Sequence, residues 1–377
     1  MATRRILYLS GTRADFGLMQ STLQRIHATA GMQVQIAVTG THLSPAHGHT
    51  IGEVRASGLP VVAEIPVDVL TRTGASMALA IAEVVRGMTD LLQRDRPDAL
   101  LLLGDRGEML AAAIAGLHVG VPVVHAHGGE RSGTVDEPVR HAISKLASYH
   151  LVATDGARER LRRMGEAEDR IFVTGAPGLD GLDTLASASR GDSLRSLGLP
   201  DQDFVLALFH PVVQQAADAA QQTGAVLQAL DRLGLPVLWL EPNADAGSRE
   251  ILATLDTGKL PAGSRRLPHL PRQQFVTAMR HCAVLAGNSS AGIIEAASFG
   301  TPVVNIGSRQ HLREHGPNVV DVPAEAGAIE AALRAQHAHG AWPWENPWGD
   351  GRAGERIAQL LARLPLDTSV LEKTNSY

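Results

Sequence analysis

The sequence predicts an α/β protein of two domains, each a doubly wound, mostly parallel sheet of the Rossmann type. Short apolar runs bounded by turn residues alternate with amphipathic stretches, as in repeated βαβ units. The length of 377 residues also exceeds what one hydrophobic core usually supports. The alternation restarts after the glycine-rich segment at 175–178. We therefore expect a first domain at 1–178, a second at 179–353, and a closing helix and tail at 354–377 that pack back on the first.

The apolar runs give the expected strands in chain order. In the first half they cover residues 6–9, 34–38, 100–103, 121–125, 151–153 and 171–173. In the second half they cover residues 205–209, 237–240, 284–286 and 303–306. The clearest amphipathic stretches predict helices over 77–94, 108–118, 223–233 and 275–281. A last helix is expected over 354–364, and residues 366–377 are expected to be frayed or to form an oligomer contact.

Composition narrows the possible ligands and compartments. The net charge of -5 argues against a nucleic-acid or anionic-membrane surface, so an anionic ligand must be bound locally. No stretch reaches the roughly 18 apolar residues of a membrane span, and the first nine residues are too short for a signal sequence. The single cysteine, Cys282, rules out an internal disulfide. We expect a cytoplasmic protein that binds no nucleic acid and no membrane.

Two motifs of the first half follow predicted strands. Residues 11–17 place glycines at a strand-to-helix turn, where backbone N–H groups can approach a phosphate and Arg13 can add charge. The alternative is a tight turn with a surface arginine. Asp105 follows the strand at 100–103 and faces the expected ligand crevice, where apolar walls could raise its pKa for acid or base work. The alternative is an aspartate that caps the helix beginning near Glu108.

The segment 125–137 holds the densest run of titratable groups. His125 and His127 share a face of a strand and could bind a metal together, but the ligand clusters of structural zinc sites are absent, so acid/base chemistry fits better. The alternative is that Asp136 caps the following helix while the histidines satisfy backbone carbonyls. Arg140 and His141 suit a helix N-terminus poorly and could instead face the ligand.

In the second half, His210 ends one strand and residues 287–292 end another. The serine-rich start of the next helix is a ready diphosphate site, and Glu295 farther along that helix could accept both ribose hydroxyls. The alternative is an N-cap serine followed by a solvent-facing glutamate. Arg309, after the strand at 303–306, offers a second arginine for a leaving diphosphate.

Taken in order, these motifs resemble the hydrolysing UDP-N-acetylglucosamine 2-epimerases, including those of the bacterial sialic- and legionaminic-acid pathways. The resemblance spans about residues 4–322 and rests on eight motifs: Gly11-Thr12-Arg13-Ala14-Asp15, Gly104-Asp105-Arg106, Gly128-Gly129-Glu130 with Ser132-Gly133-Thr134, Arg140-His141-Ala142-Ile143, His210-Pro211-Val212, Pro242-Asn243 with Asp245-Ala246-Gly247-Ser248, Asn288-Ser289-Ser290, and Gly307-Ser308-Arg309-Gln310. It implies a GT-B fold with the site in the interdomain cleft, no cofactor or metal, and a homodimer. The implied reaction eliminates the nucleoside diphosphate to give a 2-acetamidoglycal and then adds water.

The resemblance also implies roles for individual residues. Asp105 and Asp136 match two of three catalytic acids. At the position of the third acid, a glutamate in the family, this chain has His127, with Glu130 three residues on, and we favour His127 for that role. The nucleotide and its phosphates are expected to contact Arg13, His210, Asn243, His269, Ser289, Ser290, Glu295 and Arg309, and the sugar to contact His42, Arg106 and Arg140.

Other functions remain open at this point. A GT-B glycosyltransferase would need an acceptor, a non-hydrolysing 2-epimerase would keep the nucleotide on the sugar, and a nucleotide-sugar-binding module would not turn over. The sugar could be N-acetylglucosamine or a 2,4-diacetamido-2,4,6-trideoxyglucose, linked to UDP or GDP. Either product would feed nonulosonic acid biosynthesis.

Overall fold

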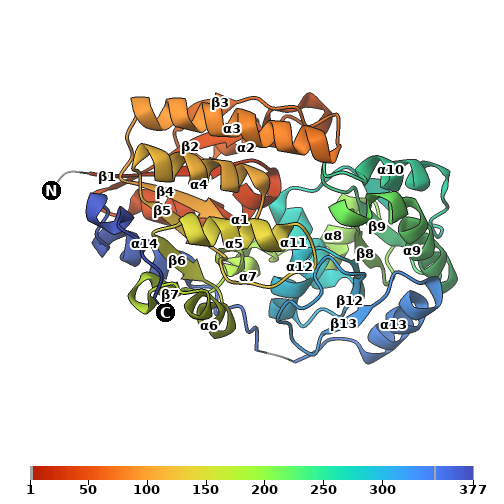
Figure 1. The fold of residues 1–377 in the computed structure, drawn as a ribbon. Coiled ribbons are helices and arrows are strands. Elements are labelled where there is room, and N and C mark those ends of the chain that lie inside the picture. Colours follow the sequence, from red (N-terminus) through yellow and green to blue (C-terminus); the bar gives the residue numbers. More distant parts are fainter. Residues whose placement is uncertain (1–2, 344, 377) are drawn as a thin grey trace.

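The computed structural model describes residues 3–343 and 345–376, and over these residues the chain forms two parallel sheets, one of seven strands and one of six (Figure 1). The strand order is β3-β2-β1-β4-β5-β6-β7 in the first sheet and β10-β9-β8-β11-β12-β13 in the second. Both orders reverse direction beside the first strand of the sheet, as in doubly wound folds. The predicted pair of Rossmann-like units is therefore confirmed.

The strands have the following bounds: β1 (Arg4–Ser10), β2 (Met32–Thr39), β3 (Val61–Ile65), β4 (Ala99–Leu103), β5 (Val123–Ala126), β6 (Tyr149–Val152), β7 (Ile171–Val173), β8 (Val205–Leu208), β9 (Val237–Leu240), β10 (Arg265–Leu267), β11 (Val284–Gly287), β12 (Val303–Ile306) and β13 (Val319–Val322). The helices are α1 (Arg13–Ala28), α2 (Ile51–Ala56), α3 (Gly74–Arg94), α4 (Gly107–Val119), α5 (Asp136–Leu146), α6 (Asp155–Arg163), α7 (Leu182–Leu185), α8 (Arg190–Leu197), α9 (Ala219–Leu233), α10 (Ser248–Thr257), α11 (Arg272–His281), α12 (Ser290–Ile294), α13 (Ala326–His339) and α14 (Ala353–Arg363).

Each sheet is buried on both faces, which explains why its central strands are continuous apolar runs. In β1, Ile6 and Tyr8 belong to the core on one face, while Leu7 and Leu9 belong to the core on the other. Helix α1 and the C-terminal α14 pack together on the first of these faces. Helices α3 and α4 cover the second face, where the buried alanines of α4 allow close packing.

The sequence prediction missed three strands, β3, β10 and β13, and all three lie at sheet edges. Edge strands are covered on fewer sides, so they need no continuous apolar run. The burial pattern confirms this reason: β3 is mostly half-buried, β10 reads Arg-Arg-Leu, and β13 carries exposed positions in its centre.

The expectation of a frayed tail is wrong for residues 366–376; Tyr377 lies outside the described residues. Val370 is buried in the first domain's core. The Lys373 ammonium donates to the carbonyl oxygens of Ser144, Lys145 and Ala147 at 2.8–3.0 Å, so it caps the carboxyl end of α5. The tail is thus held by polar contacts as well as by packing. Among the described residues, no helix is long and apolar enough to cross a bilayer.

Candidate active site

The site lies where the carboxyl ends of the two sheets face each other. Several contacts join the facing loops. Arg106, after β4, bonds Asp245, after β9, at 3.0 Å. The loop after β12 supplies others: an ion pair from Arg309 to Asp136 at 3.8 Å, an ion pair from Arg313 to Glu130 at 2.8 Å, and a backbone bond from the Gly133 N–H to the Arg309 carbonyl at 3.4 Å. Of the side chains in these contacts, Arg106, Glu130, Asp136 and Arg309 were predicted to act in the cleft, whereas Arg313 was not.

Asp105 is held by arginines rather than by a helix. The N-cap of α4 is Arg106, without a side-chain cap, so Asp105 does not cap this helix. Its carboxylate instead accepts a hydrogen bond from Arg140. Burial alone would raise the pKa of Asp105, but the charges of Arg140 and Arg313 outweigh it and hold the pKa at about 2. Asp105 is therefore ionised at neutral pH.

Arg140 was predicted to contact the sugar, and this prediction is wrong. Its side chain is fully buried. Besides Asp105, it donates to the Glu130 carbonyl at 3.0 Å, the Ser132 hydroxyl at 3.2 Å and the Glu137 carboxylate at 3.2 Å. Because the guanidinium bonds these buried partners, it holds the acidic residues in position and is not available to a ligand.

Asp136 is the first residue of α5, and its carboxyl group faces the second domain. The N-cap of this helix is Val135, so Asp136 is not the cap. Burial, followed by the negative charge of Asp105, raises the pKa of Asp136, although Arg309 acts in the opposite direction. Asp105 and Asp136 thus sit in environments that push their pKa values apart, an arrangement typical of a base and an acid that act together.

His127 and Glu130 form a hydrogen-bonded pair beside these acids. His127 has a left-handed backbone (φ 64°), and its Nδ1 lies 2.5 Å from Glu130 Oε1. Burial would raise the pKa of Glu130, but the charges of His127 and Arg313 outweigh it and lower the pKa. Because an ionised carboxylate only accepts, Nδ1 carries a proton, and in the neutral form of the ring the lone pair therefore lies on Nε2. The imidazole also stacks on Trp348, with ring centroids 6.4 Å apart.

His125 takes no part in this pair. It is fully buried, and its two ring nitrogens lie 2.7 Å from the Gly104 carbonyl and 3.2 Å from the Ser144 hydroxyl. Burial lowers its pKa to about 3, so the ring is neutral. The two histidines therefore have separate partners and do not converge on a common ligand position.

The groups predicted for the nucleotide line the second domain's side of the cleft. Ser289 is the N-cap of α12, and Ser290 is that helix's first residue. His210 Nδ1 accepts from the Asn243 N–H at 3.2 Å, so its proton must lie on Nε2. Burial and then Arg309 lower the pKa of His210 to about 3, so this ring is a neutral donor. Glu295 is buried and paired with Arg272, which the sequence did not single out.

Arg13 of the first domain and His269 of the second are near enough for the charge of Arg13 to act on the imidazole. Arg13 pairs with Glu53 at 2.5 Å. The pKa of His269 is lowered by burial and then by the charge of Arg13. His42, by contrast, is fully buried between Ser10 at 2.9 Å and Thr50 at 2.8 Å, so the predicted sugar contact of His42 is wrong.

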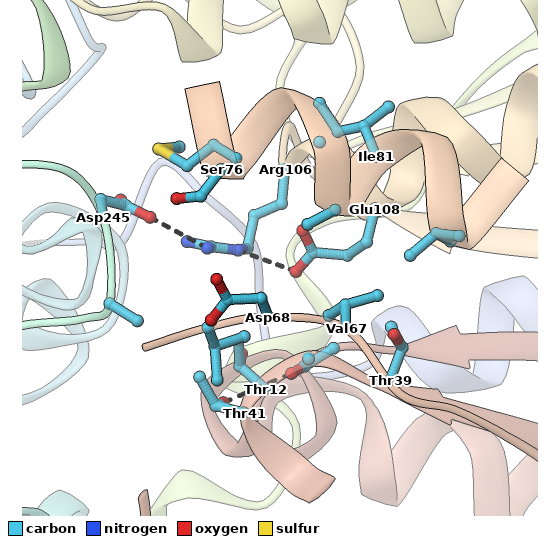
Figure 2. Close-up of a pocket in the computed structure, with 18 of the residues that line it drawn as sticks. Thr12, Thr39, Thr41, Val67, Asp68, Ser76, Ile81, Arg106, Glu108 and Asp245 are labelled. Carbon is cyan, nitrogen blue, oxygen red and sulfur yellow. Dashed lines mark hydrogen bonds and ion pairs between the residues drawn. The ribbon is translucent and has the colours of Figure 1, made fainter. Parts of the chain in front are cut away.

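A cavity of about 90 Å³ opens beside Arg106 and Glu108, on the side of the first sheet toward β2 and β3. Figure 2 shows Arg106 lying between Asp245 and Glu108, with which it bonds at 3.0 and 2.9 Å. The apolar part of the lining comes from helix α3 and the segment before it: Val67, Val69, Met77, Ala80, Ile81 and Val84. Arg106 was predicted to contact the sugar, and it lines this cavity.

Comparison with known proteins identifies the family. The model of the UDP-N-acetylglucosamine 2-epimerase family matches residues 24–362. The chain belongs to this family. A Legionella pneumophila protein named UDP-N,N'-diacetylbacillosamine 2-epimerase (hydrolyzing) is 45% identical over 99% of this chain and 100% of its own. A UDP-N-acetylglucosamine 2-epimerase of Neisseria meningitidis serogroup B is 32% identical over 95% of both chains.

Solved structures of the family confirm the GT-B fold. The Neisseria meningitidis UDP-GlcNAc 2-epimerase bound to UDP-GlcNAc has a TM-score of 0.80 at 17% identity and covers 96% of this chain and 100% of its own. The Methanocaldococcus jannaschii enzyme in complex with UDP-GlcNAc and UDP has a TM-score of 0.81 at 17% identity, with 95% and 99% coverage. At these identities the likeness is one of fold.

Proposed function

We propose that this epimerase-family chain hydrolyses a UDP-linked 2-acetamido sugar with inversion at C2, releasing UDP and the free manno-configured sugar. The observation that carries the proposal is a set of three acid/base groups on one wall of the cleft: Asp105 with a lowered pKa, Asp136 with a raised pKa, and His127 bonded to Glu130. The opposite wall holds groups suited to a diphosphate: the start of α12, neutral His210 and Arg309.

The first stage is elimination. The proton on C2 of a 2-acetamido sugar is too weakly acidic to be removed alone, so its loss must be coupled to cleavage of the C1–O bond. His127 Nε2 takes this proton, the C2–H electron pair becomes the C1–C2 double bond, and the C1–O pair leaves with UDP. Arg309, His210 and the α12 terminus stabilise the departing diphosphate, where most of the charge develops.

The second stage is hydration of the glycal. Asp136, whose raised pKa suits it to act as the acid, gives a proton to C2 from the face opposite His127, which produces the manno configuration. Water adds at C1, and its proton passes to Asp105, the ionised member of the pair. All three groups then return to their starting states by exchange with solvent.

For the sugar, we propose a 2,4-diacetamido-2,4,6-trideoxy donor. The Legionella relative that is 45% identical is named for such a substrate. With C1 at Arg309 and C2 at the acids, the C4 and C6 edge of the ring is expected to point along the cleft toward the cavity beside Arg106. The apolar side chains of α3 there suit an acetamido methyl and a 6-deoxy carbon better than hydroxyl groups.

Proton NMR in D2O with either UDP-N-acetylglucosamine or UDP-2,4-diacetamido-2,4,6-trideoxyglucose tests the proposal. The expected products are UDP and a free sugar carrying deuterium at C2, formed faster from the diacetamido donor. A 2-epimer that still carries UDP would identify a non-hydrolysing enzyme. Both donors remaining intact without an acceptor would favour a glycosyltransferase or a binding module.

A further inference from the structure

Arg313 reaches from the second domain into the acid cluster of the first. Its side chain is almost completely buried. One guanidinium nitrogen lies 2.8 Å from Glu130 Oε2 and 3.9 Å from Asp105 Oδ2. The guanidinium also lies 5.7 Å from the centre of the Trp348 ring, on which His127 stacks. Arg313 therefore contacts Glu130 directly and lies over the Trp348 ring on which His127 stacks. Its buried guanidinium is not placed to hold a ligand.

We propose that Arg313 is a positioning residue for His127, acting through Glu130, so that the base is in place only when the second domain is closed on the first. The two oxygens of Glu130 are divided between two partners: Oε1 faces His127 and Oε2 faces Arg313. Arg313 thereby fixes the carboxylate in the orientation that keeps the proton on His127 Nδ1 and its lone pair on Nε2. The proposal rests on the base role given to His127 above.

The loop that carries Arg313 is shaped for this contact. Leu312 has a left-handed backbone (φ 73°), which is unfavourable for a leucine and persists only where the surroundings impose it. The Arg313 N–H donates to the Gln310 carbonyl at 3.1 Å, and the Arg309 carbonyl accepts from Gly133 in the first domain. These two bonds hold the turn between Arg309 and Arg313, which directs the Arg313 side chain toward the first domain.

A neighbouring contact provides a matched control. Glu314, the next residue, pairs with Arg160 of the first domain at 3.4 Å and is partly exposed. This pair also ties the two domains together, but neither side chain contacts Asp105, His127 or Glu130. Glu314→Gln removes an interdomain ion pair and leaves the acid cluster untouched.

The test compares Arg313→Met, Arg313→Lys and Glu314→Gln. We expect Arg313→Met to lower kcat by about 10²-fold with little change in KM, and to move the acidic limb of the kcat profile to higher pH. The shift follows because the buried cluster of His127, Glu130, Asp105 and Arg140 loses one positive charge. Arg313→Lys should restore part of kcat, and Glu314→Gln should resemble the wild type.

A second measurement does not depend on turnover. The ¹⁵N chemical shifts of labelled imidazoles with UDP bound report which ring nitrogen carries the proton, and a His127→Gln spectrum identifies the His127 signal. They should show the Nδ1 proton of His127 in the wild type and a mixture of the two tautomers in Arg313→Met. If the wild type turns over neither donor but this difference is found, the proposed function fails and the positioning role stands. If the His127 tautomer and the kcat profile are the same in Arg313→Met and Glu314→Gln, Arg313 is only an interdomain tie. Should Arg313→Met not fold, the same two measurements on Arg313→Lys decide.

Discussion

Replacing Gly133 by alanine should slow turnover by about 10²-fold without unfolding the protein. Gly133 lies in the loop between β5 and α5, against the loop after β12. A Cβ atom at this position would lie 1.9 Å from the Ser308 carbonyl oxygen. Cβ atoms in proteins essentially never come within 3.0 Å of a heavy atom outside their own residue and its two chain neighbours. The obstacle is backbone on both sides, so the two loops must separate by about 1 Å.

This separation gives the magnitude. The loop that moves away carries Arg309 and Arg313, which contact Asp136 and Glu130. Displacing a charged group by about 1 Å from its working position costs on the order of 10²-fold in rate, or roughly 2.7 kcal/mol of activation free energy. The cores of both domains are untouched, so the midpoint of thermal unfolding should change little.

The assay is the initial rate of UDP release from the preferred donor, measured together with the thermal midpoint. Gly224→Ala is the matched control, because a Cβ on Gly224 in helix α9 would meet no atom within 4 Å. It should keep the wild-type rate and stabilise the helix by about 0.5–1 kcal/mol. A Gly133→Ala rate within twofold of the wild type would refute the reasoning that catalysis needs this close approach of the two domains.

Three further predictions concern the base, the cavity and acid stability. His127→Gln should lower kcat by at least ~10²-fold, and an unchanged rate would transfer the role to Glu130. Ala80→Leu, which fills the cavity of about 90 Å³, should lower kcat/KM about tenfold more for the diacetamido donor than for UDP-N-acetylglucosamine; equal effects would place the C4 group elsewhere. Burial would raise the pKa of Glu166, but hydrogen bonds from His150, Lys145 and Lys373 outweigh it and lower the pKa to about 2. The stabilisation from ionised Glu166 should therefore be fully present above about pH 4.5, and the free energy of unfolding in urea titrations should fall by roughly 2–3 kcal/mol toward pH 2. A Glu166→Gln variant with the same pH dependence as the wild type would contradict this.

The central strands could be predicted because burial on both faces forces a continuous apolar run, as in β4 and β8. The strand ends could then be located, and with them Asp105, His210 and Ser289 at the cleft. Strand order needs pairing information that no local pattern contains. The edge strands β3, β10 and β13 were not found because they are partly exposed and need no continuous apolar run.

The direction of a side chain was harder to predict than its position. Arg140 lies in the first turns of α5, and long helical side chains point back toward the helix N-terminus. That direction carries the guanidinium under Asp105 rather than into the cleft. His42 is likewise in a loop near the site but turned inward, where Ser10 and Thr50 satisfy its ring. Sequence position alone predicted both residues as sugar contacts.

The interdomain partners were beyond any local signal, and they carry the main physical point. Arg309 and Arg313 belong to one loop of the second domain, yet each one pairs with an acidic side chain of the first domain. Opening the cleft would remove both cations at once and free Glu130 from its fixed orientation. We therefore expect closure over a nucleotide sugar and preparation of the proposed acid and base to be one event.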